Sequence, residues 1–216
     1  MTTNIYNLII LDESGSMASI KSATIDAFNE VIQGIRNAAI DHPDLKQWIA
    51  FYAFNSKGIT EVIRLQQVDT IHELKPEDYH PDAMTPLYDA IGHTSNRLRY
   101  AIENEKDYKV LVTIFTDGAE NASREFTAIT IRNMISQLEE SGWTFTYLGA
   151  NHDVNKIASM LNIKHKMSWQ SSVFGVHYAL NLDTESRARF YKKAAANEVR
   201  DRDESYFDDN ADVKKE

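Results

Sequence analysis

The sequence predicts an α/β fold: a doubly wound, mostly parallel sheet with helices on both faces and one antiparallel edge strand. Near-continuous apolar runs at residues 5–11 and 108–118 are typical of strands that are buried on both faces. Segments with the apolar spacing of helices separate the strand-like runs. Alternating strands and helices, joined by right-handed crossovers, form a parallel sheet with helices on both sides.

The first half of the chain supplies three strands and one helix. A helix over about residues 20–35 follows the first run, and a strand rich in aromatic residues spans 47–55. The turn at 55–58 then leads to residues 59–68, whose looser alternation predicts the antiparallel edge strand. No long element is predicted for residues 69–85.

A second series of elements begins at Pro86, which suits the first turn of a helix because its missing N–H costs nothing there. The buried strand at 108–118 comes next, followed by a helix over about 128–138 and a strand at 143–150.

Capping residues indicate the last elements. Asp153 is suited to cap a short helix over 154–161, and residues 164–169 form a weak strand candidate. Ser171 or Ser172 is suited to cap a final helix over about 172–200. The chain is therefore predicted to be one domain over residues 1–200, with an acidic tail at 201–216 that is expected to fray.

Composition excludes several function classes. The net charge of −9, without a basic cluster, argues against nucleic acid and anionic membranes as partners. The chain has no cysteine, which excludes disulfides, thiolate metal sites and cysteine nucleophiles. No apolar run approaches the roughly 20 residues of a membrane span, and the first residues lack the pattern of a signal peptide. We expect a soluble, cytoplasmic protein.

Polar side chains follow the two most apolar strands. Asp12, Ser14 and Ser16 end the first strand in an i, i+2, i+4 pattern, and Asp117 ends the strand at 108–118. Thr85 precedes the helix that begins at Pro86, where it is also suited to cap that helix. Because ligands of open α/β folds bind beyond the carboxyl ends of strands, we expect these oxygens to form a cluster. Such hard donors favour Mg²⁺, with Mn²⁺ or Ca²⁺ as alternatives.

Three segments resemble the von Willebrand factor A (vWA) domain family. The segment "DESGSM" resembles the D-x-S-x-S signature of that family, "MTPLYDAI" its threonine loop and "TDG" its second aspartate, in family order. The resemblance covers about residues 4–165, and the chain is similar to stand-alone bacterial or phage-type members. It implies a Rossmann-like vWA fold with a metal-ion-dependent adhesion site. Ser14, Ser16 and Thr85 would bind the ion directly, and Asp12 and Asp117 directly or through water.

The charges of this predicted site suggest how it works. Three of its five ligands are neutral hydroxyls, so a dication would stay electrophilic and accept a carboxylate from a partner protein. The leading hypothesis is therefore a metal-dependent protein–protein interaction module, not an enzyme. The partner is unknown; the resemblance implies an AAA+ ATPase or a larger assembly. The predicted rim of the site comprises Glu13, Met17, Met84, Tyr88, Glu120 and Asn121.

Two other hypotheses use the same residues. A Mg²⁺-dependent phosphatase or other hydrolase is the main alternative. A haloacid-dehalogenase-type phosphatase would need an aspartate at position 14, where Ser14 stands. Neither a G-x-S-x-G elbow nor a phosphate-binding P-loop is present, and no histidine is placed by sequence as a base for the serines. The third hypothesis is a structural subunit whose metal only stabilises the loops.

Overall fold

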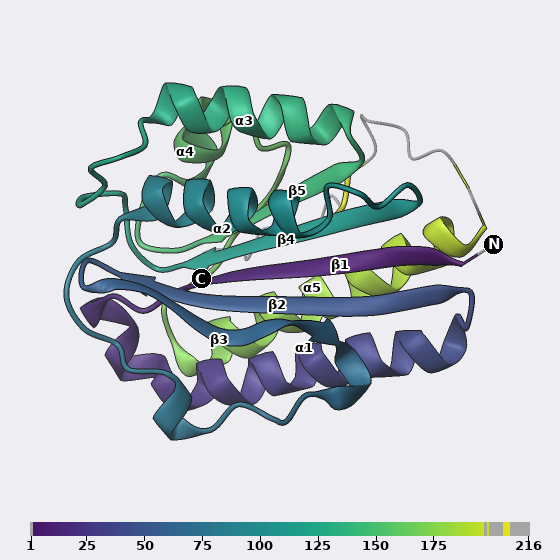
Figure 1. Ribbon diagram of the computed structural model, residues 1–216. Helices are drawn as coiled ribbons and strands as arrows, with labels where there is room; N and C mark the ends of the chain where they lie inside the picture. The colour runs from purple at the N-terminus through teal and green to yellow at the C-terminus, as the bar shows by residue number, and fades with distance from the viewer. Residues whose placement is uncertain (1, 197, 199–204, 208–216) are drawn as a thin grey trace.

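The computed structural model describes residues 2–196, 198 and 205–207 (Figure 1). Its centre is a six-stranded sheet with the strand order β3-β2-β1-β4-β5-β6. All neighbouring strands are parallel except β3, which runs antiparallel to β2 at one edge. The predicted fold class is therefore confirmed, including the antiparallel edge strand. The strands are β1 (Thr3–Asp12), β2 (Leu45–Asn55), β3 (Gly58–Gln67), β4 (Tyr108–Thr116), β5 (Trp143–Gly149) and β6 (His165–Ser168).

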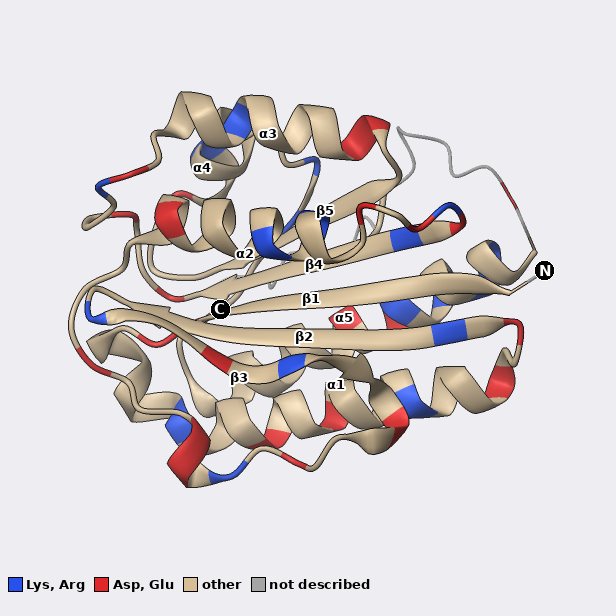
Figure 2. Ribbon diagram, viewed as in Figure 1, with Lys and Arg blue, Asp and Glu red and all other residues tan. Residues whose placement is uncertain are grey.

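Helices cover both faces of the sheet. In Figure 1, α1 and α5 lie on one face, and α2, α3 and α4 lie on the other. The helices are α1 (Lys21–Asp41), α2 (Leu87–Ala101), α3 (Ala128–Glu140), α4 (Val154–Met160) and α5 (Val173–Ala195), and short 3₁₀ turns precede α1 (Gly15–Ile20) and follow β3 (Val68–Thr70, Pro76–Asp78). In the view of Figure 2, acidic and basic residues are scattered over the elements without a concentrated basic face.

Alternation along β1 explains why its sequence is apolar at almost every position. Ile5 and Ile9 belong to the core under α1 and α5, whereas Leu8 and Ile10 belong to the core under α2 and α3. Successive side chains of a strand point to opposite faces, so a strand between two cores needs apolar residues on both.

A buried polar network ties α5 to the sheet. Arg187 is 2 % exposed, and its Nε donates to Asp183 Oδ2 at 2.6 Å within the same helix. Arg187 also donates to Asn7 Oδ1 on β1 and to the Thr113 hydroxyl on β4. The Tyr191 hydroxyl donates to the same Asn7 oxygen at 2.6 Å. A charge buried this deeply is tolerated because it is paired and hydrogen-bonded.

The end of the chain differs from the prediction where it is described. The helix α5 ends at Ala195, and most of the predicted tail at 201–216 lies outside the described residues. Tyr206 and Phe207 are buried against the core under α1 and α5, and the Tyr206 hydroxyl donates to Asp183 Oδ1 at 3.1 Å. These two aromatic residues thus do not behave as a solvated tail, because their apolar area is removed from water. None of the described helices is long and apolar enough to span a membrane.

The topology creates a switch point at the centre of the sheet. The chain leaves β1 toward α1 on one face, whereas α2 on the opposite face leads into β4. Since β1 and β4 are neighbours, Asp12 and Thr116 lie next to each other at their carboxyl ends. Open α/β sheets bind ligands at such a switch in strand order.

Candidate metal centre

Asp12 lies at this switch point, at the carboxyl end of β1. Its side chain is fully buried, its Oδ1 accepts a hydrogen bond from Ser14 N at 2.8 Å, and its Oδ2 accepts from Thr116 Oγ1 at 2.6 Å. Burial raises the pKa of Asp12 from 3.8 to about 6, against the lowering effect of those hydrogen bonds, and the Asp117 carboxylate raises it further. The carboxyl group is therefore held in a fixed orientation in a place that disfavours its own negative charge.

The two predicted serines connect Asp12 to the second carboxylate. Ser14 Oγ and Ser16 Oγ lie 3.1 Å apart, and the Ser16 hydroxyl donates to Asp117 Oδ1. Asp117 is 2 % exposed. The first and third loops of the predicted cluster therefore meet through direct side-chain contacts.

Thr85 joins the cluster from the loop before α2. Its backbone is fastened by Asn121, whose Oδ1 accepts from Thr85 N at 2.8 Å and whose N donates to Thr85 O at 3.1 Å. Pro86 is the N-cap of α2 and no side chain caps the helix, so the Thr85 hydroxyl does not serve there. A Cβ added at Gly118 would lie 2.9 Å from Thr85 Oγ1 and 3.5 Å from Asp12 Oδ2. The hydroxyl and the carboxylate therefore both border Gly118.

The donor set suits a hard divalent cation. The structure brings together all five predicted ligand residues, Asp12, Ser14, Ser16, Thr85 and Asp117, through the contacts described above. The set offers two carboxylates and three hydroxyls. Among the described residues, no group of three or more His, Asp or Glu side chains that could hold a metal is found. Oxygen donors of this kind fit Mg²⁺, Mn²⁺ or Ca²⁺ better than zinc.

Two of the predicted rim residues are buried. Met17 is 0 % exposed and packs in the core under α1, so its place in the rim was wrong. Glu13 is 5 % exposed, and its carboxylate accepts from the His80 backbone N–H. Met17 lies in the 3₁₀ turn after β1, and the turn points its side chain into the core. Its place in the sequence next to Ser16 does not show this direction.

Three more rim residues shape the loops, and one is open to solvent. Glu120 accepts hydrogen bonds from the backbone of Tyr88 at 2.9 Å and of Ser123 at 2.7 Å, so it connects the second and third loops. Asn121 clamps Thr85, as described above, and Tyr88 is partly buried. Met84 is 51 % exposed, the one predicted rim residue among the exposed large hydrophobic side chains of the described residues.

Two residues that contact the carboxylates were not predicted from the sequence. Thr116 ends β4 and donates to Asp12, and Ser171, on the loop before α5, donates from Oγ to Asp117 Oδ2 at 3.0 Å. Thr116 stands directly before Asp117 at the end of a strand, which was a usable signal. Ser171 is 54 residues from Asp117 in the sequence, and it was considered only as a possible cap of α5. Ser172 caps that helix by accepting a hydrogen bond from Gly175 N at 3.1 Å.

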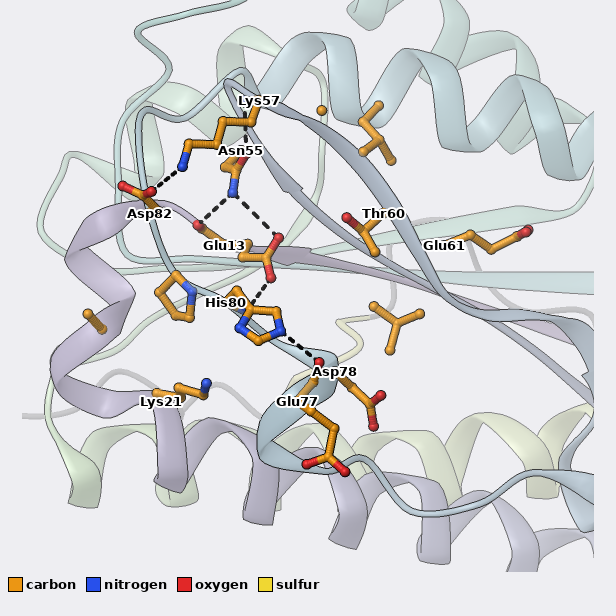
Figure 3. A pocket seen from close by; sticks show the side chains of 15 residues that line it. Glu13, Lys21, Asn55, Lys57, Thr60, Glu61, Glu77, Asp78, His80 and Asp82 are labelled. Carbon is orange, nitrogen blue, oxygen red and sulfur yellow. Dashed lines mark hydrogen bonds and ion pairs between the residues drawn. The ribbon is translucent and has the colours of Figure 1, made fainter.

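An open cleft of about 890 Å³ adjoins the loop of Asp12 (Figure 3). Glu13 faces this cleft, and Lys57 pairs there with Asp82. Glu13 O accepts from Asp82 N at 2.8 Å, and Asn55 Nδ2 donates to Glu13 O at 3.3 Å. Glu13 therefore joins the β2–β3 turn and the loop at 80–82 to the loop that follows β1. The lining is mixed in charge: Glu13, Glu61, Glu77, Asp78 and Asp82 with Lys21, Lys57 and His80.

Comparison with known proteins identifies the fold. No protein-family model and no curated protein match the sequence. Among solved structures, a von Willebrand factor type A protein from Catenulispora acidiphila superposes with a TM-score of 0.58 at 14 % identity, covering 90 % of this chain and 43 % of that one. The vWF domain of the pilus tip protein Mfa5 from Porphyromonas gingivalis gives a TM-score of 0.59 at 8 % identity, covering 93 % and 98 %. The minor pilin PilB from Streptococcus sanguinis gives 0.61 at 10 % identity, covering 88 % and 63 %.

Proposed function

From the premise that the chain has a von Willebrand factor A fold, we propose that it is a metal-dependent interaction module that binds an acidic side chain of a partner protein. The observation that carries this proposal is the meeting of two buried carboxylates and three hydroxyls at the switch point of the sheet. The partner would be a protein, and an AAA+ ATPase or a larger assembly is the class that we propose. The cited pilus proteins and vWA domains share the fold with this chain.

The residues of the cluster have separate tasks in this proposal. Asp12 and Asp117 would supply the negative charge, and the hydroxyls of Ser14, Ser16 and Thr85 would supply neutral donors. A bound Mg²⁺ would provide an electrophilic position for the carboxylate of the partner. Hydrogen bonds from Ser14 N, Thr116 and Ser171 would keep the two carboxylates oriented, as outer-shell groups do in metal sites.

The surroundings of the serines favour binding over hydrolysis. The Ser16 hydroxyl donates to Asp117, and no described histidine is hydrogen-bonded to Ser14 or Ser16. His152, at the same edge of the sheet, is bonded through Nε2 to the Tyr147 hydroxyl at 2.8 Å. A nucleophilic serine needs an adjacent base, and neither serine has an imidazole in that position.

Water-proton relaxation with Mn²⁺ tests the proposal, since Mn²⁺ takes the same donors as Mg²⁺ and reports its bound waters. We expect the wild-type chain to bind Mn²⁺ in competition with Mg²⁺, and acetate or a glutamate-containing peptide to lower the relaxation enhancement by displacing water. Asp12→Asn should abolish this binding. Asp153→Asn is the matched control, because Asp153 lies at the same edge of the sheet but caps α4. Mn²⁺ binding that survives Asp12→Asn, or an enhancement that carboxylates leave unchanged, would refute the proposal.

A further inference from the structure

Residues 169–175, which comprise the loop after β6 and the first turn of α5, are held firmly at the carboxyl edge of the sheet. The Trp169 ring stacks on Phe115 with centroids 4.4 Å apart and planes inclined by 20°. Ser172 caps α5 through the Gly175 backbone N–H at 3.1 Å. A Cβ at Gly175 would lie 1.9 Å from a backbone oxygen of the same segment, so the chain folds back on itself closely. The segment is therefore a built feature with a defined shape.

Ser171 places this segment against the metal cluster through its hydrogen bond to Asp117. Val173 and Phe174, the first two residues of α5, expose large apolar side chains: Val173 is 58 % exposed and Phe174 is 73 % exposed. Met84, which precedes the ligand Thr85, is 51 % exposed. We call Met84, Val173 and Phe174 the apolar rim.

The apolar rim stands out from the rest of the surface. Six large hydrophobic side chains are exposed among the described residues: Ile40, Met84, Tyr100, Ile129, Val173 and Phe174. The three residues of the apolar rim are half of these six. No Asp, Glu, Lys or Arg occurs between residues 167 and 182, in a chain that is 25 % charged. The Phe174 ring also stacks on Tyr178, with planes inclined by 20°, which restricts its orientation in advance of any contact. Exposed apolar groups beside a candidate binding site, as here next to Thr85 and Ser171, are typical of interaction surfaces.

We propose that the apolar rim selects partner segments in which a large apolar residue adjoins the acidic residue that the metal site takes. This inference rests on the proposed function and names the chemistry of the partner. A carboxylate at the cluster would bring its neighbouring residues onto Phe174 and Val173, where an aliphatic or aromatic side chain would be shielded from water. A protein segment fits this surface, because it can present a carboxylate to the cluster and an adjoining apolar side chain to Val173 and Phe174, which are exposed three residues or fewer from Ser171.

Selection from a phage-displayed peptide library, with one fixed central glutamate and random residues around it, tests the inference. The library is panned on the full chain with Mg²⁺ and, in parallel, with EDTA. We expect Mg²⁺-dependent binders that are enriched in Leu, Ile, Phe or Trp next to the glutamate. A synthetic peptide of the enriched sequence should bind Phe174→Ala about tenfold or more weakly than wild type, as is usual for an aromatic anchor.

Tyr100→Ala is the matched control. Tyr100 is 75 % exposed, close to the value for Phe174, but it lies at the end of α2 away from the cluster. Its substitution should change the affinity by less than about twofold. Both variants alter exposed side chains, and a circular-dichroism melt will show that they are folded.

The outcomes separate this inference from the proposed function. Mg²⁺-dependent binders without apolar enrichment, or with equal affinity for Phe174→Ala, overturn the apolar rim and leave the metal-dependent module in place. Apolar binders that ignore EDTA but need Phe174 support the surface and overturn the metal dependence. Self-association or binding to lipid vesicles that is lost in Phe174→Ala would overturn the inference, because a second copy or a bilayer would then be the occupant. A library without any binders overturns both.

Discussion

Substitution of Asp12 by asparagine is expected to stabilise the metal-free protein at neutral pH. Asp12 is fully buried, and its pKa is raised from 3.8 to about 6, first by burial and also by Asp117. Because the pKa is higher in the folded than in the unfolded state, this carboxyl group favours folding below about pH 4. That contribution is lost as the pH rises through about 6. A shift of about two pKa units corresponds to roughly 3 kcal/mol.

Asparagine can replace the aspartate without orphaning its neighbours. Its Oδ1 can accept from Ser14 N as the carboxylate does at 2.8 Å. Its Nδ2 can donate to Thr116 Oγ1, which can in turn donate to Gly118 O, already 3.0 Å away. The variant therefore removes the buried charge and keeps the hydrogen bonds, so the charge accounts for most of the change in stability.

Urea unfolding in EDTA at about pH 4 and pH 7.5 measures this effect. We expect the wild type to lose roughly 2.4 kcal/mol relative to the variant between these two pH values, since part of the effect is already lost at pH 4. At Mg²⁺ concentrations above the dissociation constant, each tenfold increase in Mg²⁺ concentration should raise the free energy of unfolding of the wild type by about 1.4 kcal/mol. The free energy of unfolding of the variant should not change. The control Asp153→Asn should keep the Mg²⁺ response. Parallel pH profiles for wild type and variant, or equal stabilisation of both by Mg²⁺, would show that the reasoning is wrong.

Three further substitutions test other parts of the structure. Thr85→Ala should weaken Mg²⁺ binding by about tenfold or more in calorimetry and leave the metal-free melting temperature nearly unchanged; a helix-capping role would do the reverse. Ser171→Ala removes one hydrogen bond to Asp117 and should weaken Mg²⁺ binding by about tenfold, with rescue by Ser171→Thr; unchanged affinity would remove Ser171 from the site. Arg187→Met should lower the free energy of unfolding by about 3–5 kcal/mol, because it leaves Asp183 buried without its cation. Urea unfolding of the double variant Arg187→Met/Asp183→Asn should recover most of that loss, and a loss equal to that of the single variant would contradict the explanation.

Local sequence patterns were sufficient to predict the fold class and the position of the candidate site. The apolar run before Asp12 indicated a strand between two cores, and the order of strands and helices indicated a doubly wound sheet. The positions of Asp12 and Asp117 after such strands predicted that they would meet, because the carboxyl ends of parallel strands share one edge. Asp153 likewise caps its helix as predicted, since a cap depends on residues only three positions apart.

The tertiary structure alone decided the roles that depend on distant neighbours. Arg187 and Asp183, four residues apart on a helix, are typical of a solvated face, yet Asn7 and Thr113 receive the arginine inside the core. Of the two serines before α5, Ser172 caps the helix and Ser171 reaches Asp117, a choice set by how the loop packs on β4. The direction of a helix or loop on the sheet also turns Met17 inward and leaves Phe174 exposed. Spacing along the chain specifies which residues share a strand end or a helix face, whereas the partner that a side chain meets depends on packing between elements far apart in sequence.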